Sequence, residues 1–365
     1  MRDLCLTSDV IVQGKHRFWM LDLLRGASAI LVLVYHSSNK FPVAYAAVDL
    51  FFMLSGFVLA ERYGESLLQT GGRRDFIHHR IARLYPVYLV CTLLGAISVI
   101  PLIGHLESWS VSAFVASSVT SLLILPAPSD TVLGILPFNG PAWSLFFEVV
   151  ANAVFLFTGA RFRVAVSAVV LSTPAFIVAL WHFRYPPGSV WGDIVGGFPR
   201  VLASFYGGVL ISCLWRQGFR IGLPAWPGWI LVAALVVLYS GFILTERKYY
   251  LLLIFVAHPV IIWFGLGLER NALFERIATW MGEISYPLYL VHVPLLILLA
   301  TYGVGDCYAL RNYLGLGNTS WGGECHRDAV SLVVFLLPLS LLMAHLIAIS
   351  IQSPVRKLWL RWRPI

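Results

Sequence analysis

The amino-acid sequence predicts an all-α polytopic membrane protein with about ten transmembrane helices. Of its 365 residues, 59% are hydrophobic and 12% are charged, whereas soluble domains carry roughly 45–50% apolar and about 25% charged residues. The apolar runs extend over about 17–24 residues, which suits helices that cross a bilayer, while barrel strands would alternate over about 10 residues. The 13 Trp and 15 Tyr residues also suit two interfacial belts.

Eleven apolar segments qualify as candidate spans. They lie near residues 18–36, 45–60, 85–104, 110–128, 142–158, 163–182, 198–216, 226–245, 249–268, 286–303 and 329–351. The segment 110–128 is the weakest, because it is rich in Ser and carries Pro126 and Pro128 near its end. We therefore expect ten helices to cross the membrane and 110–128 to form a re-entrant or interfacial segment.

The charge of the loops predicts the orientation, because Lys and Arg accumulate in cytoplasmic loops. Lys15 and Arg17 precede the first span, the loop 61–84 carries five Arg residues, and the C-terminal tail is basic. Both termini are therefore expected in the cytoplasm, which an even number of spans requires. Arg247 and Lys248 do not fit this scheme, since it places them outside.

The chain divides into a cytoplasmic segment, one membrane domain and a basic cytoplasmic tail, at residues 1–17, 18–351 and 352–365. The first segment lacks the apolar core of a signal peptide, so the first span is expected to be an uncleaved anchor. Positive-inside orientation explains the net charge of +8, and nucleic-acid binding is not expected. Cys307 and Cys325 share a loop expected outside, and whether they form a disulfide is left open.

Ionisable residues inside the first apolar segment suggest a functional stripe. A charged residue at mid-span costs about 2.5–3.5 kcal/mol on insertion scales and usually faces the bundle interior. Asp22 and Arg25 are three residues apart and are expected to pair on one helix face. Arg25 and His36 are eleven residues apart, so they share a face with a rise of about 16.5 Å between them. Alternatively, Arg25 snorkels to one interface and His36 only caps the helix at the other.

Two further spans begin with polar residues. Asp49 opens the second span and can be interfacial, while Ser55 and Gly56 are small residues that suit close helix packing. Arg80 and Arg83 lie on one face of the next span, where a forked pair of cations suits phosphate. For the arginines alone, an ordinary positive-inside flank would be the simpler interpretation.

Two later spans also contain ionisable groups. Glu148 lies more than one turn into its span and needs a partner, for which Arg200 is a candidate. His292 lies in the first part of another span, where a lone His is more often a packing residue. No spacing typical of metal ligands occurs, so no metal site is expected.

The motifs, taken in order, resemble those of the acyltransferase-3 family of membrane proteins over residues 18–350. The family has Arg or Lys, ten residues and a His in its first helix, and Arg25 and His36 fit. The other matches are Asp49 to Phe57, Arg80 and Arg83 before Tyr85 and Pro86, Trp143 and Ser144 before Glu148, and Ser285 and Tyr286 before His292. One such motif would be weak, whereas five in the same order are specific.

The resemblance implies transfer of an acyl group, usually acetyl from acetyl-CoA, to a hydroxyl of a glycan, a lipid-linked sugar or a related acceptor. Acyl-CoA would be the donor substrate, membrane lipids would surround the chain, and no tightly bound cofactor is expected. The expected location is the bacterial inner membrane. The sequence departs from the family after Glu148, at Val149 to Asn152, and no hydrolase-like soluble domain is recognised; both departures leave the acceptor open.

The resulting hypothesis gives four residues catalytic roles. His36 is the general base that takes the proton of the acceptor hydroxyl, because imidazole, with an ordinary pKa of about 6.5, exchanges protons near neutral pH. Glu148 orients His36 or stabilises its charged form. Arg25 holds the inner part of the donor, and Asp22 orients Arg25. Direct transfer and an acyl-histidine intermediate are both compatible with these residues.

Other residues are assigned to binding of the acyl donor and to structural support of the site. Arg80 and Arg83, with Arg25, would bind the CoA phosphates. Positions for substrate binding or structural support are Asp49, Trp143, Ser144, Arg200, Tyr286 and His292.

A transporter would use the same intramembrane charges, but no repeat between the halves is recognised. A scaffold without chemistry is the third class, and succinyl or a longer acyl group is the alternative to acetyl.

Overall fold

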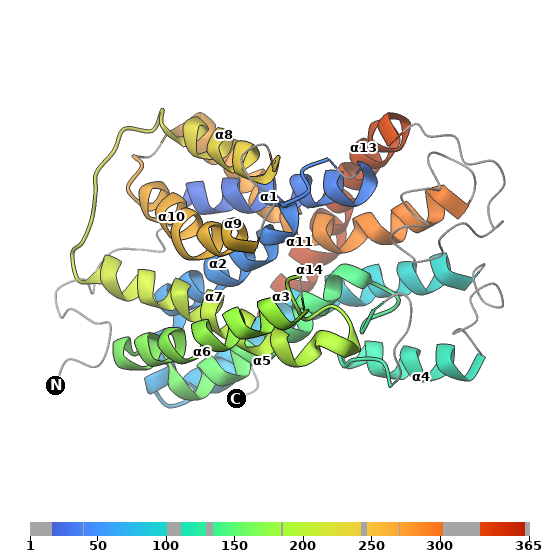
Figure 1. Cartoon of the computed structure of the whole chain (residues 1–365), viewed down its shortest axis with the longest axis horizontal. Coiled ribbons are helices and arrows are strands. Elements are labelled where there is room, and N and C mark those ends of the chain that lie inside the picture. Colours follow the sequence, from blue (N-terminus) through green and yellow to red (C-terminus); the bar gives the residue numbers. More distant parts are fainter. Residues whose placement is uncertain are drawn as a thin grey trace.

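The fold is built from helices throughout the part of the chain that the computed structural model describes. These residues are 17–38, 40–100, 111–128, 134–183, 185–241, 247–269, 271–301 and 329–361. Within them, the regular secondary structure is helical apart from isolated bridge residues, such as the pair Leu223 and Leu268. Nine helical segments of this part are long and apolar enough to cross a membrane. The expected all-α polytopic membrane protein is therefore confirmed (Figure 1).

The nine segments follow the apolar runs of the sequence. They are α1 (Trp19–Ser38), α2 (Ala47–Tyr63), α3 (Gly72–Val99), α5 (Trp143–Thr158), α6 (Phe162–Phe183), α7 (Ile194–Arg216), α9 (Arg247–Leu252) with α10 (His258–Leu266), α11 (Ala272–Thr301), and α13 (Ala329–Ile347) with α14 (Ser353–Arg361). One π-helical turn joins α9 to α10, and a second joins α13 to α14. Lys15, Cys307 and Cys325 lie outside the described residues, so the predictions for them stay predictions.

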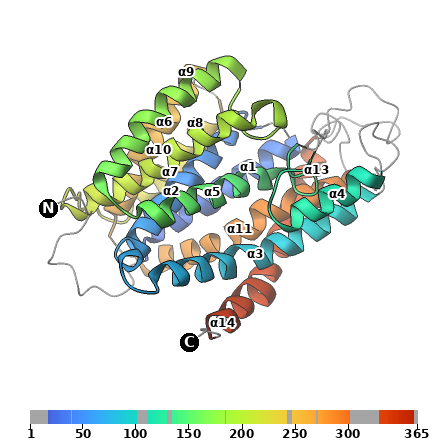
Figure 2. The same cartoon turned by 90° about the horizontal axis from the view of Figure 1, so that it is seen from below.

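Two shorter apolar helices, α4 (Val111–Leu122) and α8 (Gly228–Tyr239), account for the remaining predicted segments. The segment 226–245 was expected to be the tenth span, but α8 has only 12 residues, so the described residues contain nine segments of spanning length. The 12 residues of α4 extend over about 18 Å, well short of a hydrocarbon core of about 30 Å. The Tyr88 hydroxyl in the middle of α3 donates to the Ser121 carbonyl at 2.6 Å. The end of α4 thus reaches the middle of α3, as Figure 2 also shows, and this contact favours the re-entrant alternative over the interfacial one.

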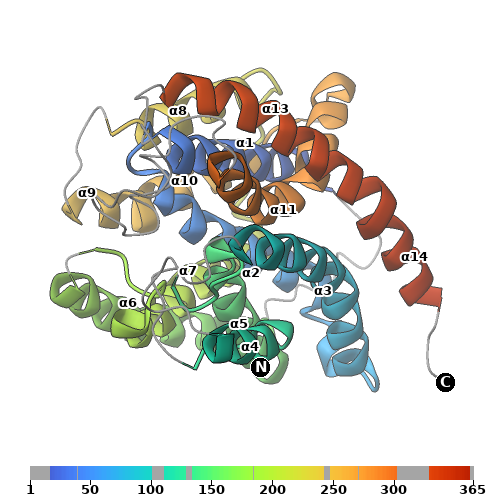
Figure 3. The same cartoon turned by 90° about the vertical axis from the view of Figure 1, so that its right-hand side faces the viewer.

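Helix α2 lies between two packed groups of helices (Figure 3). Leu50 and Leu54 pack into a cluster shared with α1, α10, α11 and α13, whereas Phe52 and Leu59 pack into a second cluster shared with α5 and α7. Gly56 allows the α2–α7 contact, because an added Cβ would lie 1.9 Å from the Phe205 carbonyl oxygen. The interpretation of Gly56 as a close-packing residue is therefore confirmed.

The outer surface of α6 is apolar, as a helix facing lipid requires. Val170, Leu171 and Val178 have exposed fractions of 61, 74 and 68%. Burying such side chains stabilises a soluble protein by about 1.5–3 kcal/mol each, so their exposure here indicates an apolar solvent. Four charged side chains, Arg25, Arg80, Arg83 and Glu148, instead face the interior of the bundle, where α1, α2, α3, α5 and α11 meet.

Candidate active site

A cavity lies between α1, α2, α3, α5 and α11. The space between its lining atoms, which includes the solvent at its open mouth, is about 760 Å³. Its polar lining consists of Arg25, Ser55, Arg80, Arg83, Ser144, Glu148, Ser285, Tyr286 and Tyr289. Apolar side chains such as Val48, Phe51, Phe52, Leu145 and Leu290 form much of the rest.

Positive charge is in excess in this cavity, since three guanidinium groups and one carboxylate face it. Arg80 forms an ion pair with Glu148, which also accepts a hydrogen bond from the Ser55 hydroxyl at 2.9 Å. Arg25 and Arg83 form no hydrogen bond or ion pair with any residue of the chain that the structure describes. Two cations are therefore left for an anionic ligand.

The structure corrects two of the expected ion pairs. Glu148 pairs with Arg80 on α3 rather than with Arg200, and it faces a cavity that His36 does not line, so the role of orienting that imidazole is not supported. Asp22 accepts a hydrogen bond from Nε of Arg17 at 2.6 Å instead of pairing with Arg25. The observed partners, Arg80 for Glu148 and Arg17 for Asp22, could not be predicted from residue spacing along one face of a helix.

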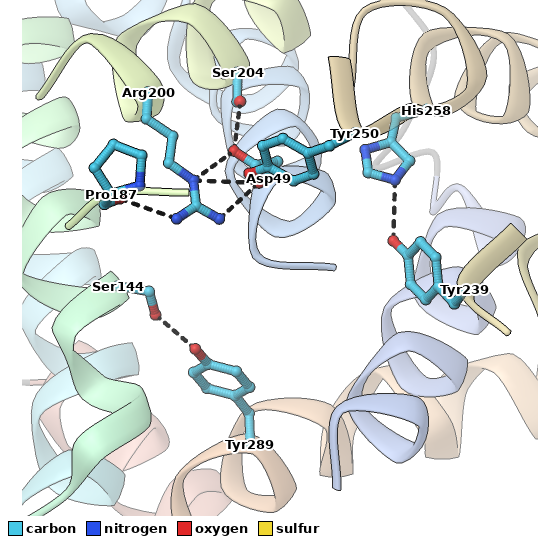
Figure 4. Close-up of polar contacts among 9 residues, drawn as sticks. All are labelled: Asp49, Ser144, Pro187, Arg200, Ser204, Tyr239, Tyr250, His258 and Tyr289. Carbon is cyan, nitrogen blue, oxygen red and sulfur yellow. Dashed lines mark hydrogen bonds and ion pairs between the residues drawn. The ribbon is translucent and has the colours of Figure 1, made fainter. Parts of the chain in front are cut away.

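Arg200 forms a second buried cluster with Asp49 (Figure 4), and neither residue lines the cavity. Its Nη2 and Nε donate to the Asp49 carboxylate at 2.8 and 3.1 Å, and its Nη1 donates to the Pro187 carbonyl at 3.0 Å. The Tyr250 hydroxyl also donates to Asp49, at 2.6 Å, and the guanidinium lies over the Trp143 ring at 5.0 Å. Asp49 is thus a fully buried anchor between α2 and α7, whereas its depth in the membrane stays a prediction.

Tyr289 forms part of the inner wall of the cavity. Its hydroxyl donates to the Pro141 carbonyl at 2.9 Å and lies 3.0 Å from the Ser144 hydroxyl. Its ring packs edge-on against Phe51, with a centroid distance of 5.5 Å. One turn earlier in α11, Tyr286 donates to the Leu84 carbonyl at 2.8 Å. These contacts hold α11 against α3 and α5 and close the cavity at this end.

The two histidines lie behind that wall. His36 is half-buried and does not line the cavity. The centroid of its ring lies 5.3 Å from that of His292, which in turn lies 6.1 Å from that of Tyr289. The structure therefore brings together the histidines of the first and last sequence motifs. Neither lines the cavity that Arg25 faces, and Tyr289, which does, lies beside His292.

Several residues of the site were not predicted. Ser55 was assigned a packing role but donates to Glu148 inside the cavity. Tyr289 and Tyr250 lie in apolar segments. Their roles follow from hydrogen bonds to residues distant in sequence, Pro141 and Asp49 respectively. Tyr289 follows Tyr286 by three residues, so its position on the same helix face was the one available signal. Taken together, the site offers an anion-binding cavity and a neighbouring imidazole pair for proton transfer.

Comparisons of the sequence with known proteins identify relatives of the chain. A family model described as an acyltransferase domain matches residues 18–350. The chain is also 39% identical over 179 residues to "Protein 2 in picA locus" of Rhizobium radiobacter, an alignment that covers 44% of this chain and 93% of the relative. No solved structure matches the chain.

Proposed function

Because the chain belongs to the acyltransferase-3 family of membrane proteins, we propose that it moves an acetyl group from acetyl-CoA to a hydroxyl of a carbohydrate or glycolipid acceptor. The family makes it an enzyme that transfers acyl groups other than aminoacyl groups. The acetyl donor, the acceptor class and the residue roles are the parts that this proposal adds. The observation that carries it is the cationic cavity, with two arginines that have no ion-pair partner among the described residues.

The cavity suits a CoA thioester because of its charge and its lining. CoA is polyanionic, and a guanidinium binds phosphate through two parallel hydrogen bonds. Arg83 and Arg25 are available for this role, whereas Arg80 is held by Glu148 and contributes mainly its charge. Phe51, Leu145 and other apolar side chains would accommodate the less polar part of the donor. The expectation that Arg80 binds phosphate directly is replaced here by a supporting role.

His36 is the proposed general base. It lies about 16.5 Å along α1 from Arg25, so a donor bound at Arg25 would extend its thioester towards the histidine pair. The acceptor oxygen attacks the acyl carbon as His36 takes the hydroxyl proton, and the sulfur leaves as the CoA thiolate. Tyr289 and Phe51 close this route in the present structure, so their side chains would have to move during transfer.

The proposed setting is a bacterial inner membrane with both termini in the cytoplasm. The basic residues that precede α1 and those on α14 support this orientation. The donor cavity, which draws its arginines from the first halves of α1 and α3, would then open towards cytoplasmic acetyl-CoA. His36, at the far end of α1, would meet an acceptor on the extracytoplasmic side.

The test is transfer of label from radioactive acetyl-CoA to a cell-envelope glycan fraction, in membranes that contain the full-length chain. We expect the wild type to label this fraction and His36→Ala and Arg25→Ala to lose labelling at equal expression. His182→Ala and Arg220→Ala, which alter exposed residues, are matched controls that should retain it. Labelling by His36→Ala at the wild-type rate would overturn the assigned base. Wild-type protein that labels nothing would favour a transporter.

A further inference from the structure

His292 is placed between His36 and the wall of the cavity. The ring contacts run from Tyr289, which lines the cavity, to His292 and then to His36. His292 has an exposed fraction of 0%. It is therefore the imidazole nearer the cavity, whereas His36 is the imidazole nearer the end of α1.

The hydrogen bonds of His292 define its tautomer. Its Nδ1 lies 3.2 Å from the Leu288 carbonyl oxygen, and a carbonyl can only accept, so Nδ1 carries the proton of the neutral ring. Nε2 is then a lone-pair acceptor. This atom is buried and has no hydrogen-bond partner in the described part of the chain. Leaving a buried acceptor unpaired is destabilising, which calls for an explanation.

We propose that His292 is a second catalytic histidine, which takes the proton from His36 on Nε2 and gives it to the CoA thiolate. This inference rests on the proposed function. The acceptor oxygen forms its bond to the acyl carbon while the carbon–sulfur bond breaks. The hydroxyl proton moves to His36, then to Nε2 of His292, and finally to the sulfur. Both imidazoles return to their neutral forms, and the products are the ester and CoA thiol.

Two histidines suit this reaction because the proton is released and consumed on opposite sides of the acyl carbon. The hydroxyl arrives from the side of His36, and the sulfur leaves towards the cavity, from which His292 is separated by the Tyr289 ring. A positioned proton donor or acceptor contributes typically 10²–10⁴-fold to a rate. His258 also has a buried nitrogen without a partner among the described residues, so what distinguishes His292 is its place between the rings of His36 and Tyr289.

The test compares His292→Gln with wild type in membranes, using labelled acetyl-CoA and the glycan fraction. Gln can still donate to the Leu288 carbonyl, but it cannot carry the proton. We expect the transfer rate at saturating acetyl-CoA to fall by about 10²–10⁴-fold, with the apparent KM unchanged within about twofold. His258→Gln is the matched control: His258 is equally buried and one of its ring nitrogens also lacks a partner among the described residues, but it bonds to Tyr239. It should retain the wild-type rate.

A rescue experiment separates chemistry from packing. Added imidazole should restore transfer by His292→Ala, whereas pyrazole, which has nearly the same shape but is a far weaker base, should not. The proposal is overturned if His292→Gln transfers at the wild-type rate, if His258→Gln loses as much activity, or if pyrazole rescues as well as imidazole. Wild-type protein that transfers no label would instead contradict the proposed function on which the inference rests.

Discussion

Arg200 and Asp49 face each other inside the helix bundle, with side-chain exposed fractions of 2 and 0%. The pair joins α7 to α2, and Tyr250 and Ser204 supply further hydrogen bonds to the carboxylate. The Asp49 carboxylate is thus satisfied entirely by groups of the protein. Such a pair costs desolvation when it forms, and its loss leaves one charge buried without a partner.

Breaking this pair should destabilise the fold more than removing both charges. We expect Asp49→Asn and Arg200→Leu each to cost about 3–5 kcal/mol, because each leaves an uncompensated buried group. The double variant Asp49→Leu/Arg200→Met should cost less than the sum. Thermal unfolding of the detergent-purified protein measures this. Glu65→Ala is the control, since that partner of Arg216 is 60% exposed; an equal loss there would contradict the argument.

Arg83→Ala should weaken donor binding rather than chemistry. Arg83 lines the cavity and has no ion-pair partner in the described residues, and a hydrogen bond to a charged group contributes about 1.5–3 kcal/mol. The apparent KM for acetyl-CoA should rise by roughly tenfold or more, with little change in kcat. Initial rates against acetyl-CoA concentration check this. Arg74→Ala, an exposed position on the same helix, should leave KM unchanged. A fall in kcat at constant KM would refute the assignment.

Tyr289→Ala should uncouple thioester cleavage from transfer. Tyr289 closes the inner end of the cavity beside His292, and a smaller side chain would admit water to the thioester. We expect CoA release without acceptor to rise several-fold, as measured with a thiol reagent. Tyr289→Phe keeps the ring and should stay near wild type. If both variants release CoA at the wild-type rate, the wall does not exclude water.

Gly56→Ala should disrupt the contact between α2 and α7. The added Cβ would lie 1.9 Å from the Phe205 carbonyl oxygen, so the backbones must separate, at a cost of about 1–3 kcal/mol or more. Gly192→Ala is the matched control, because a Cβ added there would meet nothing within 4 Å beyond its own chain neighbours. Thermal unfolding in detergent should show a lower midpoint for Gly56→Ala alone. Equal unfolding midpoints for the two variants would show that α2 and α7 can move apart without loss of stability.

The sequence by itself determined the class of the protein and the order of its helices. Run length and low charge content are local properties, and the bilayer requires both, so the apolar helices and the weakness of segment 110–128 could be predicted without a fold. Motif order also identified the family, and the spacing in α1 placed Arg25 and His36 on one face. Helical period and membrane solvation alone justify these conclusions.

The tertiary structure decided which charges meet. Glu148 pairs with Arg80 across 68 positions, and Arg200 with Asp49 across 151, and the period of one helix carries no information about either contact. It also placed Tyr289 between the cavity and the histidines and brought His292 to His36, from opposite ends of the chain. Which buried ion pairs form depends on how the helices cross and rotate. A buried charged side chain needs a partner of opposite charge, and helix packing determines which residue lies close enough to be that partner.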